Sequence, residues 1–69
     1  MRDPLRLFEA AHRLMAQSDG GDALVRAADL MKNAADQGHA GAANNYGAML
    51  QYGRGVARSL DQALLYYQK

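Results

Sequence analysis

The stretch from Ala34 to Val56 reads AADQGHAGAANNYGAMLQYGRGV, and its glycines divide it into segments. Gly38 and Gly53 enclose a run rich in alanine, together with methionine and leucine, which are residues that favour helices. Glycine is common immediately after a helix because it adopts a positive φ without steric penalty. The pattern predicts a helix over 40–52, with a turn on either side of it.

The rest of the chain has the same helical character. Its 69 residues include no isoleucine, threonine or tryptophan, and Val25 and Val56 are the only β-branched residues. Strands favour β-branched and aromatic residues, so this composition argues against a sheet. Apolar residues recur at helical spacing between breaks at 18–21, 38 and 53–58. We therefore predict an all-α fold with four helices, at about 4–18, 22–37, 40–52 and 59–68.

Polar residues at the helix boundaries predict how the helices are capped. Asp3 precedes a proline and is placed to accept from the first unpaired backbone N–H groups. We expect Gly20 to end the first helix in a left-handed conformation and Asp22 to be the N-cap of the second. Ser59 and Gln62 have the spacing of a capping box, in which each residue's side chain bonds to the other's backbone N–H.

The connections are short, so consecutive helices are expected to fold back on each other. They form two antiparallel hairpins within a single domain, 1–69. The segment 53–58 is longer, and we expect Gly53 and Gly55 to adopt positive φ values on either side of Arg54. Val56 is expected to pack beneath a helix pair; a plain flexible loop is the alternative for this segment.

An internal repeat relates the two hairpins. A shift of 36 residues places the segment 26–33 (RAADLMKN) on 62–69 (QALLYYQK). A long polar residue, a small residue and a pair of large apolar residues recur in step. A repeat of this length built from two helices is typical of an α-solenoid, in which each hairpin stacks on the next. The prediction is a short right-handed α/α superhelix of about two repeats.

The segment 34–69 resembles the Sel-one-like repeat (SLR) family, which is related to the tetratricopeptide repeats. The resemblance begins with AADQGHAGA at 34–42 and continues with Tyr46-Gly47, where the family has Leu-Gly, and with the turn GRGV at 53–56. Gln62-Ala63 stands in place of Lys-Ala, and Tyr66-Tyr67 in place of Trp-Tyr. The segment 1–21 lacks the Leu-Gly and G-x-G-V elements, and we interpret it as a degenerate first helix or an N-terminal cap.

The resemblance assigns structural roles to a set of small, apolar and aromatic repeat positions. These are Ala42, Tyr46, Gly47, Leu50, Gly53, Gly55, Val56, Ala63, Tyr66 and Tyr67. Gly47 lies inside a helix, where glycine costs about 1 kcal/mol against alanine. We expect its missing side chain to let a bulky residue, Tyr66 or Tyr67, lie against the backbone.

Composition and charge exclude several classes of protein. There is no cysteine, so there is neither a disulfide nor a zinc–thiolate site. Eight basic and seven acidic residues give a net charge of +1, too balanced for a protein held to nucleic acid by charge. No apolar run is long enough for a membrane span, and no secretory leader follows Met1. We expect a cytoplasmic protein that binds neither nucleic acid nor membranes.

The polar residues do not form a pattern typical of catalysis. His12 and His39 lie on different elements, and we interpret both as packed or solvated residues rather than metal ligands. Ser18 and Ser59 lie at helix boundaries and are read as caps. The aspartates are expected to be solvated or paired with Arg26 and Lys32; these are Asp22, Asp29, Asp36 and Asp61. An anion site at 53–55 beside Arg54 and Arg58 is the weaker alternative to a plain turn. We predict no enzyme activity and no cofactor.

The SLR resemblance implies a scaffold or adaptor that binds a partner protein or peptide. Solenoids present their first helices as one face, here the helices at 4–18 and 40–52. Two stripes of the latter helix supply the candidate contact residues: Asn45, Met49 and Tyr52 on one, and Asn44 and Gln51 on the other. Ordinary lining of the interface between these two helices is the competing interpretation.

A second hypothesis follows from the last helix. No helix after 59–68 covers Leu64, Leu65, Tyr66 and Tyr67, and two repeats make a marginal array. The chain is then either a self-associating module that completes its core through this helix, by oligomerisation or helix exchange, or a fragment of a longer repeat protein.

Overall fold

The computed structural model of the chain describes residues 3–17 and 21–68. Within them lie four α-helices, α1 (Pro4–Gln17), α2 (Asp22–Asp36), α3 (Ala40–Tyr52) and α4 (Leu60–Tyr67). The predicted all-α fold is confirmed, and the described helix ends lie within one residue of the predicted ones. The predicted end of α1 at residue 18, its cap at Gly20 and the cap assigned to Ser18 lie outside the described residues.

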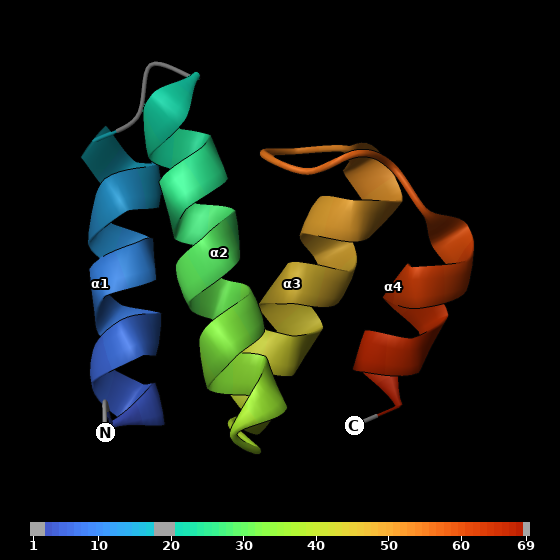
Figure 1. Ribbon diagram of the computed structural model, residues 1–69, viewed down its shortest axis with the longest axis horizontal. Helices are drawn as coiled ribbons and strands as arrows, with labels where there is room; N and C mark the ends of the chain where they lie inside the picture. Colours follow the sequence, from blue (N-terminus) through green and yellow to red (C-terminus); the bar gives the residue numbers. More distant parts are fainter. Residues whose placement is uncertain (1–2, 18–20, 69) are drawn as a thin grey trace.

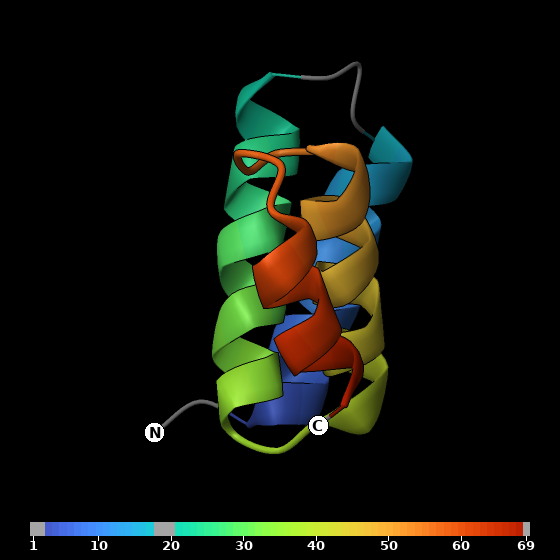
Figure 2. The same ribbon diagram turned by 90° about the vertical axis from the view of Figure 1, so that its right-hand side faces the viewer.

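The helices form two antiparallel hairpins that lie side by side. α1 packs against α2, α2 against α3, and α3 against α4. Figure 1 and Figure 2 show the result from two directions, with α1 and α4 at opposite ends of the stack. Each of the two inner helices is therefore covered on both sides, whereas α4 has a packed neighbour on one side only.

The first two helices begin differently from one another. The Asp3 carboxylate accepts a hydrogen bond of 3.0 Å from the backbone N–H of Leu5, which confirms the predicted cap of α1. The predicted N-cap of α2 is wrong by one residue, because Gly21 takes that position with a φ of 63°. Asp22 is instead the first residue of the helix. There its carboxylate acts on the partial positive charge of the helix N-terminus.

α3 begins at a histidine cap that the sequence did not predict. The chain leaves α2 through Gly38, whose φ is 97°. His39 is then the N-cap, and its Nδ1 accepts a hydrogen bond of 3.0 Å from the backbone N–H of Ala42. The His39 ring thus satisfies one of the unpaired N–H groups of the helix start, as Ser or Asp does elsewhere.

α4 uses half of the predicted capping box. The Ser59 hydroxyl oxygen accepts a hydrogen bond of 3.3 Å from the backbone N–H of Gln62. The reciprocal half of the prediction is wrong, because the N–H of Ser59 donates to the carbonyl of Leu50 at 2.9 Å. That bond ties the start of α4 to the end of α3.

Small residues dominate the core between the helices. Alanines on all four helices are buried, and Met31 and Met49 are the largest fully buried side chains. Alanine leaves the backbones free to approach closely, so this core depends on near contact of the helices rather than on large side chains. The buried hydrophobic residues are Leu7, Ala11, Ala27, Ala28, Met31, Ala34, Ala35, Ala42, Ala43, Tyr46, Met49, Leu50 and Ala63.

The loop between α3 and α4 packs against the molecule. Gly53 and Gly55 have φ values of 67° and 74°, as predicted. A side chain at Gly55 would meet the backbone of Leu24, so the loop lies directly on α2. Val56 is half-buried and packs against the core, which confirms the expected packing rather than a plain flexible loop.

Candidate functional site

The face shared by α1 and α3 is held together by its own side chains. Asn45 Nδ2 lies 3.3 Å from His12 Nε2 and links the two helices. The Phe8 ring stacks on His39 and meets His12 edge-on, with ring centroids 4.5 Å apart in both pairs. Both histidines thus have partners within the fold, as expected for packed residues.

The residues predicted to contact a partner on this face divide into two groups. Met49 is only 2 % exposed, so its prediction as a surface contact residue is wrong, and it belongs to the core. Gln51 is engaged within the chain, since its side chain accepts from the Tyr67 hydroxyl and its carbonyl from Arg58 Nε. Asn44 and Tyr52 remain exposed.

An open, largely apolar groove lies between α3 and α4. We call it the α4 groove; it is lined by Gln51, Leu60, Ala63, Leu64 and Tyr67. Leu60 and Leu64 are 51 % and 59 % exposed, and Tyr67 is 40 % exposed. None of the lining side chains carries a charge. Leu65 is 61 % exposed but lies outside the groove.

Gly47 fixes one wall of the α4 groove. An atom at its Cβ position would lie 2.9 Å from Cδ1 and Cε1 of Tyr67, closer than van der Waals contact allows. The ring predicted to lie against Gly47 is thus that of Tyr67 rather than Tyr66. The Tyr67 hydroxyl donates a hydrogen bond of 2.8 Å to Gln51 Oε1, which holds the ring across the two helices.

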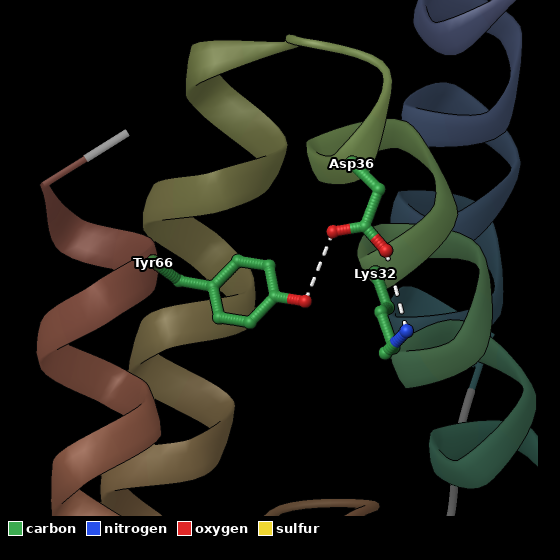
Figure 3. Close-up of polar contacts among 3 residues, drawn as sticks. All are labelled: Lys32, Asp36 and Tyr66. Carbon is green, nitrogen blue, oxygen red and sulfur yellow. Dashed lines mark hydrogen bonds and ion pairs between the residues drawn. The ribbon is translucent and has the colours of Figure 1, made fainter.

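Tyr66 points the other way and joins α4 to α2. Its hydroxyl donates to Asp36 Oδ1 at 3.0 Å, and Lys32 Nζ lies 3.2 Å from Asp36 Oδ2 (Figure 3). The Tyr66 ring also meets Tyr46 edge-on, with centroids 4.7 Å apart. Burial raises the pKa of the Tyr66 hydroxyl, and its hydrogen bond to Asp36 and the negative charge there raise the pKa further. Burial likewise raises the pKa of Tyr46.

The first hairpin contains a covered counterpart of the α4 groove. The 36-residue shift relates the lining residues to Met15, Leu24, Ala27, Ala28 and Met31. Three of these are at most 1 % exposed, and the other two pack partly buried against the core. The first hairpin is covered by α3, whereas no described helix occupies the equivalent place beyond α4.

The turn at 53–55, the weaker candidate for an anion site, is bonded to the end of α3. The N–H of Arg54 donates to the carbonyl of Met49 at 2.9 Å, and Arg58 Nε donates to the Gln51 carbonyl. The N–H groups of Gly53 and Arg54 therefore bond within the chain, to the end of α3. Asp36 pairs with Lys32 as predicted.

Within residues 3–17 and 21–68, no three histidine or acidic side chains gather as a metal site. No helix there has the length and apolarity to cross a membrane.

Comparison of the chain with protein-family models, with curated proteins and with solved structures finds no match. The sequence resemblance to SLR proteins therefore remains a prediction.

Two functional features were not found from the sequence. The Tyr66–Asp36 bond joins residues 30 apart, and no local pattern indicates such a pair. Gln51 was predicted as a partner contact, but its role in lining the α4 groove was not. Leu64, Leu65 and Tyr67 are exposed as predicted, whereas the same prediction is wrong for Tyr66, which packs partly buried against the core.

Proposed function

We propose that this chain is a non-enzymatic protein-interaction module of the SLR type, and that it binds a helix of a partner protein in the α4 groove. The observation that carries the proposal is the correspondence between the two hairpins. Ala28 and Met31 are at most 1 % exposed in the first hairpin, whereas their equivalents Leu64 and Tyr67 are 59 % and 40 % exposed in the second. Exposed leucines at such positions are typical of a surface that another helix covers.

α3 indicates the chemistry of the partner helix. It presents Gly41 and Asn45 toward α1, and the neighbouring Ala42 is buried. Met49 extends the same stripe one turn further and is also buried. α3 is one helix that fits such a groove, with small residues in its first turns and one long apolar side chain near its end, and we infer that the partner helix is likewise amphipathic.

The face of α1 and α3 has weaker support as the binding surface. Asn45 is bonded to His12, and Met49 is buried. A partner would have to displace these contacts. In the α4 groove a partner gains apolar contact without breaking an internal hydrogen bond.

A tandem chain tests the proposal. Residues 34–69 are appended after Lys69, which continues the 36-residue repeat in register and supplies a second copy of α3. If the α4 groove takes an α3-type helix, half-exposed Leu60, Leu64 and Tyr67 become buried. The free energy of unfolding then rises by about 3 kcal/mol above that of the single chain. Chemical denaturation of both chains measures the difference.

A matched pair of variants controls this experiment. Leu64 and Leu65 are adjacent and equally exposed, and only Leu64 lines the groove. In the first copy of the tandem, Leu64→Glu removes most of the gain in stability and Leu65→Glu leaves it. Identical midpoints for the single and tandem chains, or equal losses from the two variants, contradict the proposal.

A further inference from the structure

The two ends of the helix stack differ in charge. Asn45 of α3 contacts the first hairpin, and the buried Ala42 and Met49 lie at helical spacing on the same side of α3. The 36-residue shift places these three positions on exposed charged residues of α1, namely Arg6, Glu9 and Arg13. A helix with this edge would bury charged side chains on entering an apolar groove, which is costly even where they pair with one another. The α1 end is therefore closed to stacking.

The α4 end is open, and its apolar stripe is symmetric. Leu60, Leu64 and Tyr67 follow one another along one side of the helix, with Leu64 near the middle. When two such helices meet antiparallel, Leu64 lies opposite Leu64, and Leu60 lies opposite Tyr67 at both ends. The charged residue nearest the stripe, Asp61, then lies at opposite ends of the contact in the two copies. Within α4 itself, Leu60–Tyr67, no like charges therefore meet across it.

We propose that the occupant of the α4 groove is a second copy of this chain, in a closed antiparallel dimer with its two-fold axis near Leu64. The inference rests on the proposed function of the groove and specifies its partner. The charged α1 edge excludes head-to-tail stacking, so assembly stops at two copies. With three partly exposed apolar side chains per copy, the contact belongs to the small, transient class of interfaces, below about 1,200 Å² in total.

Analytical ultracentrifugation of the full chain tests the dimer. Because a small interface gives weak affinity, the concentration range runs from about 10 μM to about 2 mM. We expect the weight-average mass to rise toward twice the monomer mass and no further. Leu64→Glu weakens the dimer at least tenfold, whereas Leu65→Glu, which changes an equally exposed leucine outside the groove, leaves its dissociation constant within about twofold. Circular dichroism checks that both variants stay folded.

Three results overturn the inference: a monomer at every concentration, equal weakening by both variants, or growth beyond the dimer. The tandem-chain experiment separates this failure from failure of the proposed function. If the single chain is monomeric and the tandem chain is still stabilised, the groove remains a helix-binding site. Only the second copy is then excluded as its occupant.

Discussion

At the residue scale, Gly47 determines how closely α3 and α4 approach each other. Its Cβ position lies within 3.2 Å of three atoms of the Tyr67 ring, so any side chain there displaces the ring. We expect Gly47→Leu to lower the free energy of unfolding by about 2 kcal/mol, despite the better helix propensity of leucine. Thermal or urea denaturation measures the loss.

A double variant assigns the cause of that loss. With Tyr67→Ala in place, the ring no longer occupies the space beside residue 47, and Gly47→Leu is expected to cost much less. An unchanged melting temperature for Gly47→Leu alone, or the same cost in both backgrounds, argues against this packing role.

His39 is the second residue whose chemistry is specific to its position. Its Nδ1 caps α3 while its ring stacks on Phe8, so it serves both a helix start and the contact with α1. His39→Ala removes both interactions and is expected to destabilise the chain by about 1–2 kcal/mol. His39→Asn restores a capping oxygen and recovers part of that loss. Equal stability of the two variants in urea would show that the cap contributes nothing.

At the scale of elements, the bond between Tyr66 and Asp36 attaches α4 to α2. The folded-state pKa values of Tyr66 and Tyr46 are raised above their ordinary value of 10.0. A raised pKa means that folding favours the neutral hydroxyl. Its stabilisation is complete below about pH 10 and is lost as the pH rises through the folded-state values. We expect the free energy of unfolding to fall above pH 10.

Tyr66→Phe isolates the contribution of this bond to the pH dependence. The variant has no hydroxyl to ionise beside Asp36, so its stability should decline less steeply above pH 10 than that of the native chain. Urea denaturation at several alkaline pH values compares the two slopes. A steeper decline in Tyr66→Phe would contradict the role of the bond.

The helices themselves were predictable from the sequence because glycines and caps mark their ends. The differences between the predicted and observed helix caps have local causes. Gly21 takes the N-cap of α2 because its positive φ turns the chain there, and Ser59 donates to Leu50 rather than to its capping partner. Helical periodicity placed Met49 on one stripe with Asn45 and Tyr52. Helical periodicity does not specify how deeply each residue of a stripe is buried. In the fold Met49 is buried, whereas Tyr52 is 69 % exposed.

At the scale of the whole molecule, the chain is a short stack with unlike ends. α1 ends it with Arg6, Glu9 and Arg13, whereas α4 ends it with the exposed leucines of the groove. The exposure of Leu64 and Leu65 was expected from the sequence. The lining of the groove depends on the Gly47–Tyr67 approach and the Tyr67–Gln51 bond, which only the folded chain brings together.

The central claim is that the α4 groove is an open place for an α3-type helix. The most direct measurement is a methyl NOE spectrum of the tandem chain with labelled leucine, alanine and methionine. The account predicts cross-peaks from the methyl groups of Leu64 in the first copy to Ala42 and Met49 in the appended copy. Leu64 methyl groups that show only contacts within their own hairpin, in a tandem chain that is fully folded, would contradict it.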